Sequence, residues 1–121
     1  MKREKPISPL KEKSYQFAIK IVHLSQSLIS VEREYVLSKQ IIRSGTSIGA
    51  LVRESEFAPS RADFINKLTV ALKEANETEY WLMILFDTNF LTEIYFKELL
   101  SNCKELIAML VSSIKTAKNL I

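Results

Sequence analysis

Apolar residues recur at spacings of three and four along almost the whole chain, with polar residues between them. This periodicity is typical of amphipathic α-helices, whereas strands would alternate at every second residue. The pattern predicts four helices: residues 10–30, residues 34–57, a third helix after Ser60 and a fourth after Thr92. Pro59 is expected to end the second helix, because proline lacks the amide that continues the hydrogen-bond ladder.

The third predicted helix has the most regular seam. Its inward positions alternate spacings of four and three residues, the pattern of a left-handed bundle: Phe64, Leu68, Ala71, Ala75, Thr78, Leu82 and Leu85. Ser60 followed by Asp63 is a variant of the capping box, and Thr92 stands where it would cap the fourth helix. The first helix is expected to begin with Ser8 as its cap and Pro9 at its first position.

Short connections between long helices make sequential neighbours antiparallel. We therefore expect an all-α protein, an antiparallel up-down-up-down four-helix bundle that is left-handed and oligomeric. The 121 residues, 47% of them hydrophobic, are enough for one domain with its own core. Two glycines and three prolines are too few for a sheet protein with many turns. Residues 1–121 are expected to form this single domain, with residues 1–9 as a flexible basic segment.

Both glycines lie in the second predicted helix, four residues apart. Glycine destabilises a helix interior by about 1 kcal/mol relative to alanine, so this pair indicates close packing of two helices. Antiparallel pairing of the second and third helices places Gly45 near Leu72 and Gly49 near Leu68. The small residues expected to line this helix contact are Gly45, Gly49, Ala71 and Ala75.

The same register brings Arg43 level with Glu74. We therefore predict a partly buried ion pair between Arg43 and Glu74 or Glu77. Its net stabilisation is expected to be close to zero if desolvation offsets the attraction, so that its role is to fix the register.

Seven consecutive apolar residues, from Tyr80 to Phe86, point in every direction around the third helix. One explanation is a central helix whose excess apolar surface is half-exposed in a monomer. The other is that Trp81, Ile84 or both form a subunit interface. Doubled apolar positions on the second helix favour a second buried stripe and hence a homo-oligomer.

The net charge of +3 and the pI near 9.0 permit nucleic-acid binding without requiring it. Basic residues concentrate in residues 1–60, including Lys2, Arg3 and Lys5 near the start. Without an RNA-binding motif, any contact would be with phosphates and shape rather than with bases. Simple solvation of a lysine-rich surface is the alternative. The candidate nucleic-acid-binding residues are Lys11, Lys13, Lys20, Lys39, Arg53 and Arg61.

The residue types needed for catalysis or metal binding are scarce. His23 is the only histidine and Cys103 the only cysteine, so they do not make up a zinc site. No phosphate-binding loop, nucleophile elbow or dinucleotide fingerprint is present. We therefore expect no enzyme activity, no metal and no cofactor. The charged start, the lone cysteine and the lack of a long apolar run favour a cytoplasmic protein that does not enter a membrane.

One block of the sequence resembles a known family. The strings SGTSIGALVRE and DFINKLTVALKEANETEYWLMIL are similar to the 23S rRNA-intervening-sequence proteins, and the resemblance extends over about residues 14–114. Many members read SIPANIAEG at the second helix, where this chain reads SIGALVRES from Ser47 to Ser55. Leu51 replaces the common Asn and Ser55 the common Gly, so a polar role at Leu51 does not carry over.

The resemblance implies an up-down-up-down bundle that assembles into a barrel-shaped or funnel-shaped homopentamer. One branch, the accessory variability proteins of diversity-generating retroelements, binds nucleic acid through a basic surface of the ring. The family name records where some of the genes lie and does not establish binding to ribosomal RNA. The family has no catalytic motif that would map onto this sequence.

Three functions remain open at this point. The leading hypothesis is a small oligomeric adaptor that binds RNA or another nucleic acid, because a ring repeats a modest basic patch and gains avidity. The second is a protein–protein scaffold or accessory subunit that binds no nucleic acid itself. The third, an enzyme or metal protein, has the least support from the residues.

Overall fold

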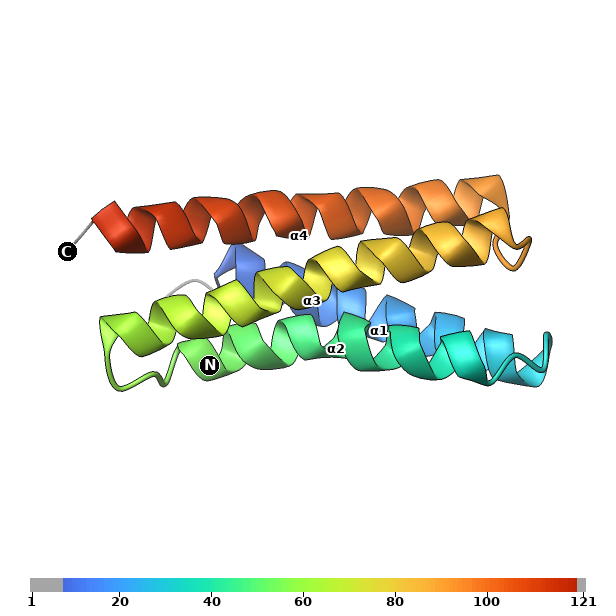
Figure 1. Cartoon of the computed structure of the whole chain (residues 1–121), viewed down its shortest axis with the longest axis horizontal. Coiled ribbons are helices and arrows are strands. Elements are labelled where there is room, and N and C mark those ends of the chain that lie inside the picture. The colour runs from blue at the N-terminus through green and yellow to red at the C-terminus, as the bar shows by residue number, and fades with distance from the viewer. Residues whose placement is uncertain (1–7, 120–121) are drawn as a thin grey trace, which may run out of the picture.

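The computed structural model describes residues 8–119, which form a bundle of four helices without a strand. The helices are α1 (Pro9–Ser30), α2 (Val36–Ser55), α3 (Arg61–Asp87) and α4 (Glu93–Asn119). Successive helices run back and forth along the long axis of the molecule (Figure 1). The second helix is two residues shorter at each end than its apolar pattern predicted. Residues 1–7 of the predicted basic segment lie outside the described residues.

The predicted caps of the last two helices are present. The Asp63 amide donates to Ser60 Oγ at 3.0 Å, and the Tyr95 amide donates to Thr92 Oγ1 at 3.3 Å. Ser8 occupies the cap position of α1, but its side chain makes no capping hydrogen bond there. The start of α1 is therefore favoured by Pro9, whose ring fixes a helical φ angle, rather than by a side-chain cap.

All four helices contribute to one core. The predicted seam of α3 is buried almost throughout, and Ile41 and Ile48 are completely buried on α2. The other two helices bury apolar side chains as well: Phe17, Ile21, Leu24 and Leu28 on α1 and Leu99, Cys103, Leu106 and Leu110 on α4. The α1–α4 contact is the least extensive of the four. Long polar side chains bridge it: Lys13 Nζ lies 2.6 Å from Glu105 Oε2, and Lys20 Nζ lies 3.1 Å from Glu98 Oε2.

The glycines face α1, so the prediction that they pack against α3 is wrong. A Cβ atom on Gly45 would lie 2.8 Å from Cγ2 of Ile21, and one on Gly49 would lie 3.2 Å from the carbonyl oxygen of Ser14. Ala71 and Ala75 are fully buried on α3, and the Ala75 carbonyl accepts a hydrogen bond from Cys103 on α4. The glycines thus provide room for the side chain and backbone of α1.

Candidate functional site

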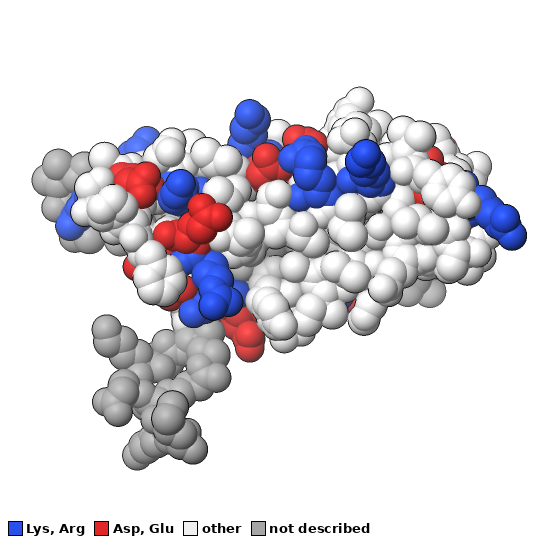
Figure 2. Space-filling view, turned by 90° about the horizontal axis from the view of Figure 1, so that it is seen from below, with Lys and Arg blue, Asp and Glu red and all other residues white. Residues whose placement is uncertain are grey.

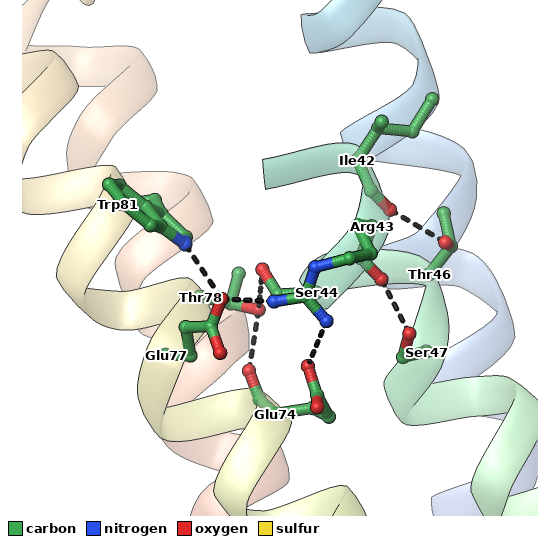
Figure 3. Close-up of polar contacts among 9 residues, drawn as sticks. All are labelled: Ile42, Arg43, Ser44, Thr46, Ser47, Glu74, Glu77, Thr78 and Trp81. Atoms are coloured by element: carbon green, nitrogen blue, oxygen red, sulfur yellow. Dashed lines mark hydrogen bonds and ion pairs between the residues drawn. The ribbon is translucent and has the colours of Figure 1, made fainter. Parts of the chain in front are cut away.

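A polar network connects the exposed edges of α2 and α3 (Figure 3). Arg43 reaches from α2 between two carboxylates of α3, with Nη1 3.1 Å from Glu74 Oε1 and Nη2 paired with Glu77. The indole Nε1 of Trp81 donates to Glu77 Oε2 at 3.1 Å. The structure therefore contains the ion pair that the register predicted, and it adds Trp81 to that pair.

The network shifts the titration of two of its members. The pKa of Glu77 is lowered, first by the hydrogen bond from Trp81 and then by Arg43, while burial acts in the opposite direction. The pKa of Arg43 is raised, mainly by its hydrogen bond to Glu77. Because two carboxylates already neutralise Arg43, its guanidinium is a poor candidate for binding phosphate.

Removing this guanidinium is expected to have a small effect. Arg43→Met should lower the free energy of unfolding by less than about 1 kcal/mol, because the Arg43 side chain is 50% exposed and exposed ion pairs contribute little. Chemical denaturation at two pH values checks this prediction. A lowered pKa stabilises the fold above the ordinary glutamate value of 4.5, and that contribution is lost as the pH falls through the folded-state pKa.

The matched comparison is Glu77→Gln, which keeps the shape of the side chain and removes its titration. We expect the stability difference between wild type and Glu77→Gln to be constant near neutral pH and to shrink in acid. A difference that stays unchanged below the ordinary glutamate value of 4.5 would contradict the role given to Glu77.

Buried hydroxyl groups form a second set of contacts between helices. The Thr78 hydroxyl of α3 hydrogen-bonds the Ser44 hydroxyl of α2 at 2.9 Å, and Ser25 of α1 hydrogen-bonds Ser38 of α2 at 2.7 Å. These four side chains are at least 98% buried. Because these hydroxyl groups bond to each other inside the core, they determine which faces of the helices pack together. They leave no unpaired polar group there that could bind a ligand.

The three lysines predicted for nucleic-acid binding on α1 are already paired with carboxylates. Lys11 lies 3.0 Å from Glu56, and Lys13 and Lys20 make the ion pairs with α4 described above. Lys20 also donates to the Asn102 side chain at 2.9 Å. The first helix therefore presents less net positive charge than its sequence suggests.

Other cations gather at the end of the bundle where α3 begins and α4 ends. Arg61 Nη1 donates to the Ala117 carbonyl at 3.4 Å, and the exposed Lys115 and Lys118 lie on the last turns of α4. Within residues 8–119, none of these three cations, nor Arg53 or Lys39, lies at ion-pair distance from a carboxylate.

Lys115 and Lys118 were not among the nucleic-acid-binding residues expected from the sequence. Antiparallel pairing of α3 with α4 was the available signal that they would lie beside Arg61. Lys39 lies on α2 near the opposite end and does not join this group.

A groove of about 340 Å³ runs between α1 and α2. Small or apolar side chains line most of it, and charged residues lie at one rim. The lining residues are Lys11, Glu12, Tyr15, Ala18, Thr46, Gly49, Ala50 and Arg53.

The remaining candidates for catalysis or metal binding, His23 and Cys103, do not form a common site. His23 is exposed on α1, whereas Cys103 is fully buried on α4. Burial raises the pKa of the Cys103 thiol to about 12, so the reactive thiolate is scarce near neutral pH. In the described part of the chain, no three His, Cys, Asp or Glu residues are grouped as a metal ion would need. None of the described helices combines the length and the apolar character that crossing a bilayer requires.

Comparison with known proteins establishes to which family the chain belongs. The family model described as 23S rRNA-intervening sequence protein matches residues 9–112, which span all of α1 to α3 and most of α4. The chain belongs to this family. The resemblance drawn from the residues around Gly45 and Gly49 is therefore confirmed.

A solved relative of this family member has the same fold. It is the crystal structure of a protein with unknown function from the S23 ribosomal protein family of Bacteroides thetaiotaomicron. The two chains are 53% identical and superpose with a TM-score of 0.87, over 88% of this chain and 98% of the relative. No curated protein matches the sequence.

Proposed function

We propose that this family member is a non-enzymatic adaptor that binds RNA through a basic surface as a homo-oligomer, a pentamer of left-handed antiparallel bundles acting in the cytoplasm. The observation that carries the RNA-binding part is the group of cations at one end of the bundle. Arg61, Lys115 and Lys118 have no carboxylate partner among residues 8–119, so they are free to neutralise phosphates.

The position of these cations supports the proposal further. They lie towards the same end of the bundle as the start of α1 (Figure 1). An oligomer repeats this basic end in every subunit, and several weak phosphate contacts then act together. Contacts of this kind depend on charge and give little sequence specificity.

A fluorescent single-stranded RNA of mixed sequence tests the proposal in a salt titration. Lys115→Gln combined with Lys118→Gln should weaken binding by about tenfold at low salt and make the salt dependence shallower, because counterion release follows the number of phosphate contacts. The matched control is Lys39→Gln with Lys73→Gln, which removes two exposed lysines that also lack ion pairs in the described chain but lie elsewhere.

Each outcome of this titration has a definite meaning. No binding by the wild type at low salt rejects RNA as the partner. Equal losses in both double variants reject the α3–α4 end as the binding surface and point to diffuse charge instead.

A protein–protein scaffold is the second candidate, and the opposite end of the bundle favours it. The α1–α2 connection, the first residue of α2 and the first turn of α4 lie there (Figure 1). They carry apolar side chains that are mostly exposed. The exposed fractions are 69% for Val31, 57% for Tyr35, 70% for Val36 and 84% for Ile94. A partner protein that is retained after nuclease treatment, and lost with Val36→Lys and Ile94→Lys, would support this function over RNA binding.

A further inference from the structure

One face of the bundle, made by α1 and α2, is almost free of charge. The two helices meet with Ile21 against Gly45 and Ser14 against Gly49. The groove residues between these two contacts, Tyr15, Ala18 and Thr46, carry no charge. Figure 2 shows a broad uncharged surface on this side of the molecule, with charges towards one end and one edge. We call it the α1–α2 face; it includes Tyr15, Ala18, Val22, Ile42, Thr46 and Ala50.

This face is apolar and hollowed by the groove between the two helices. Thr46 donates its hydroxyl to the Ile42 carbonyl at 2.6 Å, so the hydroxyl is already satisfied within the helix. Ile42 and Thr46 lie on the side of α2 next to α1, away from Glu74 and Glu77 (Figure 3). Gly49 and Ala50 leave the groove of about 340 Å³ open because they have little or no side chain.

A second apolar surface lies on α3, within the consecutive apolar residues from Tyr80 to Phe86. We call it the α3 patch; it consists of Tyr80, Trp81, Met83 and Ile84. Tyr80 is 58% exposed and Met83 46% exposed, whereas Trp81 and Ile84 are partly buried. The rings of Tyr80 and Trp81 meet edge to face at 5.1 Å, which fixes the aromatic surface in place.

We infer that the α3 patch of one copy of this chain packs into the α1–α2 face of the next copy. This inference rests on the oligomer of the proposed function and assigns its interface. A hollow lined by small residues and an aromatic projection are complementary in shape, and both belong to the same chain. Contact between two different surfaces is heterologous, which is the kind of interface that closes a ring with an odd number of subunits.

The charged residues beside the two surfaces also favour contact between two copies of this chain. Arg53 lies at the rim of the groove, and Asp87 lies one helical turn beyond Met83. Neither forms an ion pair with any residue from 8 to 119, whereas Lys11 at the same rim is already held by Glu56. Glu12 lies at the same rim and also forms no ion pair in this range, so the groove carries one unpaired cation, Arg53, beside one unpaired carboxylate, and Asp87 beside the α3 patch is the carboxylate that would meet Arg53.

Cysteine cross-linking tests the pairing of the two surfaces. Ala50→Cys and Tyr80→Cys are made as separate chains with different tags, co-expressed, and oxidised after purification. The native Cys103 is 0% exposed and serves as an unreactive background in the wild-type control. The heterologous interface predicts a disulfide only between an Ala50→Cys chain and a Tyr80→Cys chain. Either variant alone should give no cross-linked dimer.

A second measurement is independent of cysteine geometry. Ala50→Arg should dissociate the oligomer in light scattering, because it places a charge in the groove at a position exposed in the single chain. Ala108→Arg, an exposed alanine on α4 outside both surfaces, is the matched control and should keep the wild-type mass.

The outcomes separate this inference from the proposed function. A monomeric wild type rejects the oligomer and the interface together. An oligomer that survives Ala50→Arg and gives no mixed disulfide rejects this interface and leaves the oligomer standing. A disulfide within Ala50→Cys alone shows that the α1–α2 face meets itself, which overturns the heterologous contact.

Discussion

Gly45→Val is expected to lower the free energy of unfolding by about 3 kcal/mol, the upper part of the range for overpacked cores. A Cβ atom at position 45 would already lie 2.8 and 2.9 Å from the two γ carbons of Ile21, and Ile21 is completely buried. The added methyl groups have no open space, so α1 and α2 must move apart. Thermal or urea denaturation monitored by circular dichroism measures the loss.

Ile21→Ala should restore part of the stability lost in Gly45→Val, because it removes the γ carbons that cause the clash. Alone, Ile21→Ala leaves a cavity and should be destabilising by about 2–5 kcal/mol. The double variant has the same number of side-chain carbon atoms at the two positions as the wild type. Its loss in free energy of unfolding should therefore be smaller than the sum of the losses in the two single variants, because the effects of residues in contact are not additive. Additive effects would contradict the contact between Gly45 and Ile21.

Gly49→Ala provides a milder comparison. Its Cβ atom would lie 3.2 Å from the backbone oxygen of Ser14, a tight contact rather than a clash. Alanine also favours a helix by about 1 kcal/mol over glycine, which offsets the strain. The change in stability should be clearly smaller than that of Gly45→Val.

The second large effect is expected at the buried hydroxyl pair between α2 and α3. Thr78→Val keeps the shape of the side chain but removes the partner of the Ser44 hydroxyl, which is completely buried. Leaving a buried polar group without its partner is destabilising by about 1–3 kcal/mol. The free energy of unfolding from urea denaturation should fall by that amount.

Ser44→Ala combined with Thr78→Val tests the reason for this loss. Removing both hydroxyls leaves no unsatisfied group, so the double variant should be more stable than Thr78→Val alone. Thr69→Val is a matched control, because the exposed Thr69 hydroxyl bonds only the Ile65 carbonyl of its own helix. If the double variant is as unstable as Thr78→Val, the hydroxyl pair does not connect the helices as described.

The candidate surfaces were predictable from the sequence to different degrees. The contact of Arg43 with Glu74 and Glu77 followed from the antiparallel register. This register depends only on the short connection between two adjacent helices, which fixes which of their residues lie beside each other. The pairing of Lys13 with Glu105 joins residues 92 positions apart, from the first and last helices. No local sequence pattern specifies a contact between residues so far apart in the chain. The pairing of the α1 lysines with carboxylates was therefore not predictable.

The sequence by itself determined the four helices, most of their buried faces, two of their caps and the family. Helix periodicity and capping depend on residues within one or two turns of each other, so the chain carries this information locally. Only the tertiary structure decided that the glycines face α1, that the cations of α1 are neutralised, and that free cations gather where α3 begins and α4 ends. These properties depend on how helices rotate and approach one another, which many distant side chains set together through packing in one core.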